Sequence, residues 1–158
     1  MEEFSFSYKR STVAELPVQV QLLIKASEDV ARHAYAPYSN FKVGAAALLA
    51  DGTTRVCANH ENASYPAGTC AERGLLAHIN PTEEQEQIMA IAVSYISDAK
   101  TQTPLSPCGI CRQTILEQQL AQGSPIAIYM CSTDGHVLIV DDVTHLLPFY
   151  FSSKNLDL

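Results

Sequence analysis

The fold is decided by residues 43–59, VGAAALLADGTTRVCAN. Residues 43–50 are a continuous run of small apolar side chains, and residues 53–59 form a second segment after Asp51-Gly52. An Asp-Gly pair tolerates the positive φ angles of a tight two-residue turn. The pattern therefore predicts a β-hairpin.

The segments on both sides of this hairpin predict further helices and strands. Residues 17–35 carry apolar side chains at near-helical spacing, which predicts an amphipathic helix. Other helices are predicted at 70–79, 107–121 and 142–147, and other strands at 88–96, 126–131 and 136–140. This order predicts an α/β fold, a three-layer α-β-α sandwich in which helices cover both faces of a mixed five-stranded sheet.

Length and composition exclude several classes of protein. The chain has 158 residues, of which 47% are hydrophobic, and we expect one domain, residues 1–158, with a substantial core. Ten Lys and Arg residues, scattered along the chain, oppose 17 Asp and Glu residues and give a net charge of -7. Nucleic acids and acidic membranes attract basic surfaces, so neither is an expected partner.

The sequence also indicates a cellular compartment. Residues 1–10 lack the apolar core of a signal peptide, and the longest apolar uncharged stretch, residues 87–97, is too short to span a bilayer. We therefore expect a cytoplasmic protein. Its five cysteines are an odd number, and in a reducing compartment they are expected to be free thiols or metal ligands.

Three cysteines have the spacing of a metal site. Cys108 and Cys111 stand at positions i and i+3 of a predicted helix, so they share one face and can hold one ion. Cys70 supplies a third thiolate from another helix. Three thiolates indicate one zinc ion per chain. The sequence has no second knuckle that would supply a fourth Cys or His ligand, so one position is left for water, which is typical of a catalytic site.

Glu72 and Arg73 follow the first of these cysteines. Helix residues two positions apart point about 200° apart, so Cys70 and Glu72 converge only on an ion that lies beyond the helix N-terminus. There Glu72 reaches the water without being a ligand and acts as general base and then general acid. Three thiolates also leave the zinc centre with net negative charge. We predict that two helix N-termini, and hydrogen bonds from Arg73 to the sulfurs, compensate that charge.

These motifs, taken together, resemble the cytidine deaminase family, specifically its small single-domain type with three zinc cysteines. The matching segments are YSNFKVGAA (38–46), NHENA (59–63), CAER (70–73), SPCGICRQ (106–113) and LLP (146–148), followed by Phe151. They occur in the family's order from about residue 20 to residue 155. The three-cysteine form with a non-ligand glutamate is a general pattern of zinc deaminases, and the reaction below comes from that pattern.

The resemblance implies hydrolytic deamination of cytidine and deoxycytidine to the uridines, with release of ammonia, as a step of pyrimidine salvage. Water activated by zinc attacks C4 of the cytosine ring, and Glu72 carries protons to N3 and to the leaving amine. The backbone of Ala71 and Ser106 would contact the base. Asn59 and Glu61 match the ribose-binding pair, and strand alternation places both on one side with the residue between them facing away. A carboxylate here repels phosphate, which favours a nucleoside over a nucleotide.

The resemblance also implies an assembly. Phe41 matches an aromatic residue that packs on the substrate, and Phe151 matches one that stacks on the base from a neighbouring subunit. Ala63 and Tyr65 fall where the family lends contacts across a subunit boundary. The protein is therefore expected to be a homotetramer with composite active sites, whose monomer is inactive. His60 stands where an aliphatic residue is expected.

Three other interpretations of the cysteines stay open at this level. They are buried apolar side chains, a structural zinc site in which Glu72 is the fourth ligand, or a thioredoxin-type dithiol pair. The dithiol pair is disfavoured because the chain has no tryptophan and the motif does not follow an early strand. A non-catalytic interaction module stabilised by zinc is the alternative to an enzyme.

Overall fold

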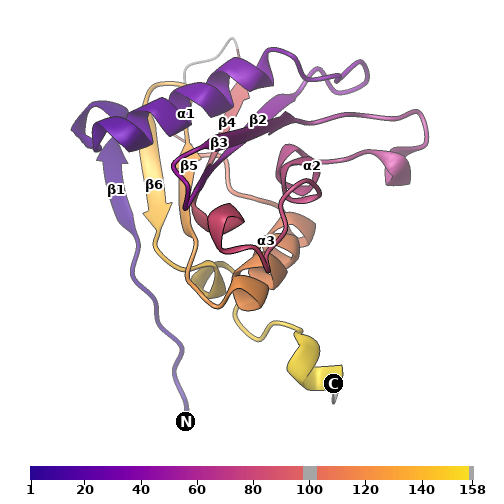
Figure 1. Ribbon diagram of the computed structural model, residues 1–158. Coiled ribbons are helices and arrows are strands. Elements are labelled where there is room, and N and C mark those ends of the chain that lie inside the picture. The colour runs from indigo at the N-terminus through magenta and orange to yellow at the C-terminus, as the bar shows by residue number, and fades with distance from the viewer. Residues whose placement is uncertain (98–102, 157–158) are drawn as a thin grey trace.

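A computed structural model describes residues 1–97 and 103–156 of the chain (Figure 1). Its sheet has six strands in the order β1-β6-β5-β4-β2-β3. The strands are β1 (Lys9–Thr12), β2 (Lys42–Leu49), β3 (Thr54–Ala58), β4 (Ile88–Ile96), β5 (Ala127–Cys131) and β6 (His136–Val140). The α-helices are α1 (Val18–Ala31), α2 (Ala71–Leu76) and α3 (Gly109–Gln122). The 3-10 turns are η1 (Val13–Glu15), η2 (Tyr65–Ala67), η3 (Glu84–Glu86), η4 (Val143–Leu146) and η5 (Ser153–Leu156).

The predicted hairpin is confirmed as β2 and β3. The two strands pair antiparallel from Leu48 opposite Thr54 to Gly44 opposite Ala58. Gly52 has a φ of 84° in the turn, a value that a side-chain-bearing residue rarely adopts. The sheet is mixed, because β4 and β5 pair parallel while the other neighbouring strands pair antiparallel.

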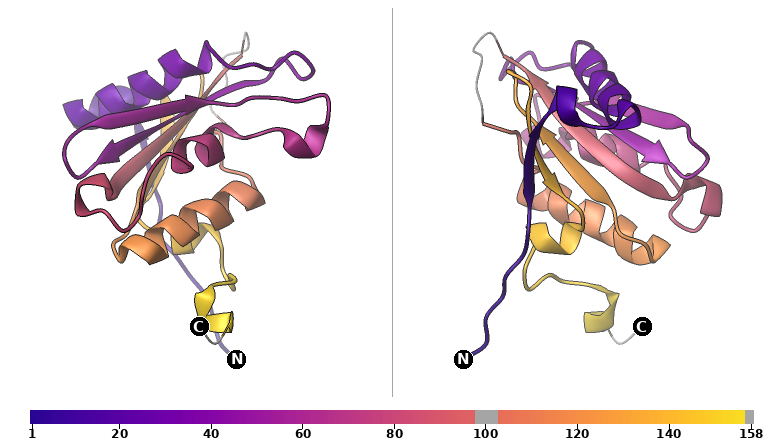
Figure 2. Two further views of the ribbon diagram at one scale, coloured as in Figure 1. Left: turned by 45° about the vertical axis from the view of Figure 1, so that its right-hand side comes forward. Right: turned by 90° about the vertical axis from the view of Figure 1, so that its left-hand side faces the viewer.

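Helices cover both faces of the sheet, as predicted (Figures 1 and 2). The central strands β2 and β4 are buried on both faces, and their successive side chains point to opposite faces of the sheet. Ala46 and Ala92 pack with the apolar side chains of α1, whereas Ile91 and Val93 belong to the core beneath α2 and α3. Along β4, the side chains that face α1 are thus small, and those that face α2 and α3 are larger.

Gly44 explains why the face toward α1 is built from small residues. A Cβ atom at Gly44 would lie 2.0 Å from the backbone oxygen of Ser27 and 2.8 Å from the backbone nitrogen of Ala31. Both are backbone atoms of α1, so neither can rotate away. The backbone of β2 and that of α1 are therefore in direct contact.

Gly44→Ala is accordingly expected to lower the free energy of unfolding by about 3 kcal/mol, the upper end of the range for overpacked cores. The matched control is Gly109→Ala, because a Cβ at Gly109 meets no atom within 4 Å. Urea denaturation followed by far-UV circular dichroism measures both variants. Equal unfolding midpoints for the two variants would contradict the close approach of α1.

The prediction of five strands was wrong, since the sheet has a sixth strand, β1. It pairs antiparallel with β6 at the edge of the sheet, with Lys9 opposite Ile139 and Thr12 opposite His136. Its sequence, KRST, has no apolar alternation, and its side chains are exposed or half-buried. Backbone hydrogen bonds to β6, which no side-chain pattern reveals, hold this strand in place.

Several predicted helices are shorter than expected. The segment predicted at 70–79 is helical only over Ala71–Leu76, because the next N–H groups bond three residues back, as His78 does to Leu75. The first helix likewise ends at Ala31, and the segment predicted at 142–147 is the 3-10 turn η4. None of the helices within the described residues is both long and apolar enough to cross a membrane. The domain prediction covers 1–158, of which 98–102 and 157–158 lie outside the described residues.

Candidate active site

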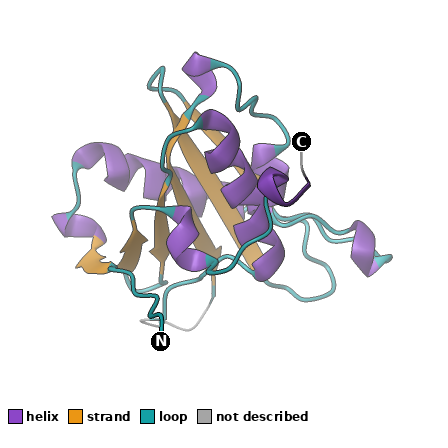
Figure 3. Cartoon of the chain, turned by 90° about the horizontal axis from the view of Figure 1, so that it is seen from below, coloured by secondary structure: helices purple, strands orange, loops and turns teal. Residues whose placement is uncertain are grey.

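The three predicted metal-binding cysteines come together at the starts of two helices. Cys70 is the N-cap residue of α2 and Cys108 is the N-cap residue of α3, with Cys111 one turn further along α3. The three sulfur atoms all lie within 4.8 Å of one another, and those of Cys108 and Cys111 are 3.6 Å apart. α2 and α3 lie on the same side of the sheet, as their labels in Figure 1 show, and Figure 3 shows this side from below. The predicted convergence of two helix N-termini is thus present.

The geometry and charge of this cluster fit a zinc ion. Thiolates at about 2.3 Å from a tetrahedral zinc ion are about 3.8 Å from each other, which agrees with the observed separations. Burial, followed by the charge of Glu72, raises the pKa of Cys111, while burial also raises the pKa of Cys70. Burial alone would raise the pKa of Cys108. Hydrogen bonds to its sulfur, first among them the one from the Cys111 backbone N–H, together outweigh this effect, so the pKa of Cys108 is lowered. Crowded sulfurs of this kind are stabilised as thiolates by a divalent cation.

Glu72 lies beside the cluster and is only 5% exposed. Burial raises the pKa of its carboxyl group, and hydrogen bonds from its own backbone N–H and from the Cys111 thiol oppose part of that rise. Among the described residues, the three cysteines form a group whose ligand atoms all lie within 4.8 Å of one another, and Glu72 does not belong to this group. A buried carboxyl group next to a metal site, and outside its ligand set, has the placement of a proton carrier.

A cavity of about 320 Å³ opens over the cluster. Among the residues predicted for the site, Phe41, Asn59, Glu61, Ala71, Glu72, Ser106 and the three cysteines line it. Ser39, Val43 and Leu105 complete its wall. The structure therefore places the predicted base-contacting and ribose-contacting residues in one cavity with the cysteines and Glu72.

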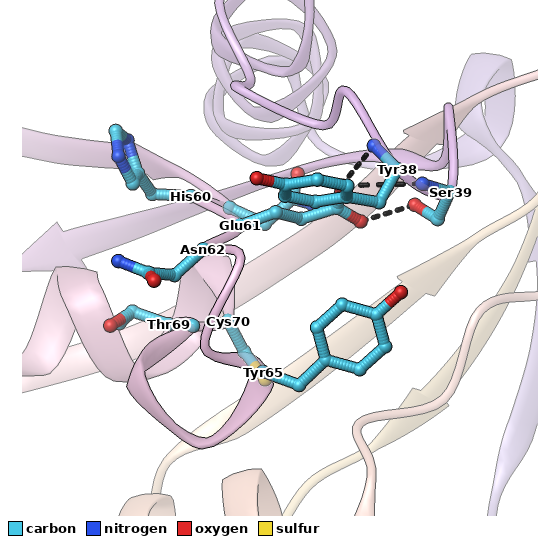
Figure 4. A pocket seen from close by; sticks show the side chains of 10 residues that line it. Tyr38, Ser39, His60, Glu61, Asn62, Tyr65, Thr69 and Cys70 are labelled. Atoms are coloured by element: carbon cyan, nitrogen blue, oxygen red, sulfur yellow. Dashed lines mark hydrogen bonds between the residues drawn. The ribbon is translucent and has the colours of Figure 1, made fainter.

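Asn59 and Glu61 are fixed in this cavity by the first residues of β2 and by the segment before it. The Asn59 amide accepts a hydrogen bond from the Val43 N–H at 2.8 Å and donates one to the Phe41 carbonyl at 3.0 Å. The Glu61 carboxylate accepts hydrogen bonds from the backbone N–H groups of Tyr38 and Ser39 and from the Ser39 hydroxyl (Figure 4). The Ser39 hydroxyl, followed by the Tyr38 N–H, lowers the pKa of Glu61, which keeps this carboxylate charged near neutral pH.

His60 faces away from the Glu61 carboxylate, as alternation predicted (Figure 4). Its ring stacks on Tyr35, with 4.8 Å between the ring centres. His60 and Tyr65 line a neighbouring hollow of about 400 Å³, which shares Asn59, Glu61 and Cys70 with the active-site cavity. This stacking accounts for an aromatic residue at a position where an aliphatic one was expected.

The remaining predicted residues lie outside the cavity. Arg73 is half-buried and lines a different hollow, between α2 and α3, and in the described part of the chain its guanidinium makes no hydrogen bond to a sulfur. Ala63 and Tyr65 belong to the loop that projects from the body around η2 (Figure 1). Phe151 lies in the C-terminal segment, where its side chain is 57% exposed. The predicted roles of these residues stay predictions.

Two residues missed by the sequence reasoning support the cavity. The Phe41 ring packs on Tyr95 of β4, with 5.5 Å between ring centres, and no motif marked that tyrosine. Arg112 contacts Ser106 and was quoted within a motif without a role. Ser39 lines the cavity and was also given no role, although it belongs to the quoted motif YSNFKVGAA, which could have identified it.

A mixed sheet, two helices that begin at a three-cysteine cluster and a buried glutamate beside it define the class of the zinc deaminases. The family model "Cytidine and deoxycytidylate deaminase zinc-binding region" matches residues 17–123. The chain belongs to this family.

Relatives of known sequence and structure agree with this membership. The cytidine deaminase of Halalkalibacterium halodurans is 38% identical over 137 residues, which cover 87% of this chain and 97% of that relative. The cytidine deaminase of Sporosarcina psychrophila is 37% identical over 139 residues, which cover 88% of this chain and 96% of that relative. The crystal structure of cytidine deaminase from Burkholderia pseudomallei superposes with a TM-score of 0.69 at 38% identity, over 83% of this chain and 98% of that one.

Proposed function

We propose that this protein is a zinc-dependent hydrolase that deaminates cytidine and deoxycytidine to uridine and deoxyuridine with release of ammonia, in pyrimidine salvage. The observation that carries the proposal is the placement of Glu72 in one cavity with the three sulfur atoms. The names of the relatives, cytidine deaminases that match nearly their whole length, support the substrate class.

In the proposed reaction, Cys70, Cys108 and Cys111 hold the zinc ion. Zinc in such a site acts as a Lewis acid and lowers the pKa of water. Glu72 takes a proton from the attacking water and delivers protons to N3 of the base and to the leaving amine. Burial, which raises the pKa of Glu72, brings this carboxyl group closer to the range in which it both accepts and donates a proton.

The cavity wall favours a nucleoside over a nucleotide. Asn59 and Glu61 offer an amide and a carboxylate to sugar hydroxyl groups, and Phe41 offers an aromatic surface. No Lys or Arg is among the described residues that line this cavity, and the charged Glu61 repels a phosphate group. Ala71 and Ser106 also line the cavity and stand close in sequence to Cys70 and Cys108, which supports contacts between their backbone groups and the base.

Arg73 is proposed to offset the negative charge of three thiolates, together with the N-termini of α2 and α3. Its position next to Glu72 on a helix that begins at Cys70 supports this role. We also propose a cytoplasmic location, which rests on the sequence.

The proposal is tested by metal analysis of the purified protein together with measurement of ammonia released from cytidine. One zinc per chain and ammonia release that stops under a chelator and returns with added zinc are expected. A protein that binds zinc but releases no ammonia would be an interaction module instead. Undiminished turnover in metal-free protein would contradict the whole proposal.

We further propose a homotetramer with composite active sites. Tyr65 and Phe151 are 75% and 57% exposed, although both are large aromatic side chains. They lie on segments that extend from the body of the chain, the loop at η2 and the C-terminal segment (Figures 1 and 2). Exposed aromatic side chains on projecting segments suit contacts with neighbouring subunits.

Phe151→Ala is expected to lower kcat/KM for cytidine by about 10-fold or more, because stacking of an aromatic ring on a base contributes about 1–3 kcal/mol. Steady-state kinetics measures the loss, and light scattering measures the assembly. Leu22→Ala, at an exposed apolar residue of α1, on the opposite face of the sheet from the cysteine cluster, is the control and should keep normal kinetics. A fully active monomer would contradict the composite site.

A further inference from the structure

Arg112 of α3 binds two other parts of the chain, the residues just before α3 and the turn η4. Its Nε donates a hydrogen bond to the Pro107 carbonyl at 2.8 Å, and its Nη2 donates one to the Ser106 hydroxyl at 2.8 Å. Its Nη1 donates a third, at 3.0 Å, to the carbonyl of Leu146 in η4. The planar guanidinium has donors in three directions, a geometry that lysine cannot reproduce.

The acceptors of these hydrogen bonds belong to the active-site wall and to the segment behind it. Ser106 lines the active-site cavity and also a second cavity of about 360 Å³, which is lined by Arg112 and Leu146 as well. The Ser106 residue is exposed and lines two cavities, so its side chain lacks the close packing of a core residue. The contact with Arg112 therefore has a large part in fixing its position.

The next residue of α3 holds the far end of the same C-terminal segment. Gln113 donates a hydrogen bond from Nε2 to the Phe151 carbonyl at 3.0 Å. Arg112 and Gln113 thus attach the beginning and the end of residues 146–151 to the helix that also carries Cys111. From the other side, the Phe6 ring stacks on His145, with 5.8 Å between ring centres.

We propose that Arg112 is a positioning residue for the reaction, which sets the Ser106 backbone against the base and holds the C-terminal segment in register with α3. This inference rests on the proposed function for the contact between Ser106 and the base. Arg112 itself does not line the active-site cavity, so it acts through Ser106.

The test compares Arg112→Lys and Arg112→Met with the control Arg32→Lys, at an exposed arginine of which Nε lies 3.7 Å from the Asp29 carboxylate. For Arg112→Lys we expect kcat/KM for cytidine to fall by about 10- to 100-fold, chiefly through KM, as the loss of one hydrogen bond from a charged donor predicts. Arg112→Met should lower kcat/KM by at least the same factor. Zinc content should stay at the wild-type value in all variants, which separates positioning from metal binding.

Hydrogen–deuterium exchange gives a second readout that does not depend on turnover. In Arg112→Lys, amides of residues 105–108 and 143–151 should exchange faster, while those of β2 and β4 keep their protection. Normal kcat/KM in Arg112→Lys would overturn the proposal, as would a loss that only follows the zinc content. If Arg112→Met does not fold, the lysine variant decides. If the wild-type protein releases no ammonia, the proposed function fails, and unchanged exchange in Arg112→Lys would separately show that Arg112 does not hold these segments.

Discussion

Glu72→Gln is expected to keep its zinc and to lower kcat for cytidine by about 10²- to 10⁴-fold, the usual contribution of a general acid–base group. Glutamine has nearly the same shape but neither accepts nor donates the proton that the reaction moves. Glu72 is 5% exposed, so bulk water reaches this position poorly and does not replace the carboxyl group. Steady-state ammonia release and metal analysis of the same preparation measure the two quantities together.

The control for this prediction is Glu84→Gln, which neutralises an exposed carboxylate in η3. It should leave both kcat and zinc content unchanged. Loss of zinc from Glu72→Gln would instead identify Glu72 as a metal ligand and the site as structural. Wild-type activity in Glu72→Gln would rule out its role as the proton carrier.

Cys111→Ala is expected to remove the zinc and to lower activity by more than about 100-fold, because even residues that only support a metal ligand are worth 10- to 100-fold. Cys111 is 1% exposed and lies within 4.8 Å of the other two sulfurs, so its thiolate has no substitute nearby. Two remaining thiolates do not complete a zinc site of this type. Zinc per chain, measured by atomic absorption, and ammonia release are the readouts.

Cys131→Ala is the matched control, since Cys131 is also buried, at 2% exposure, but lies on the other side of the sheet in the core beneath α1. This variant should keep one zinc per chain and its activity. Zinc retained in Cys111→Ala would show that the three sulfurs do not form the binding site.

Most of the sheet was predictable from the sequence because its central strands are apolar. β4 was predicted with its observed bounds, Ile88–Ile96, from an uninterrupted apolar run. β1 was not predictable, because KRST has the composition of a loop and pairs only through backbone groups with β6. The ends of α1 and α2 also differed, since their last turns tighten into 3-10 geometry.

The candidate site was predictable where chemistry depends on local spacing. Cys108, Cys111 and the pair Cys70 and Glu72 follow from helix geometry, and the structure brings all four to one cavity. Contacts between distant segments were not predictable. One of the carbonyls that Arg112 binds belongs to Leu146, 34 residues further along the chain. For Arg73, adjacency to Glu72 suggested contact with the sulfurs; its side chain lines the hollow between α2 and α3, and its role toward the sulfurs stays a prediction.

The tight contact between β2 and α1 has a consequence for protein engineering. Gly44 follows Val43, whose side chain lines the active-site cavity and whose N–H binds Asn59. Any enlargement at Gly44 must displace either α1 or the strand, and a displaced strand carries Val43 and Asn59 with it. Variants selected for altered substrate range are therefore expected to include replacements on the far side of the sheet, remote from every atom of the nucleoside.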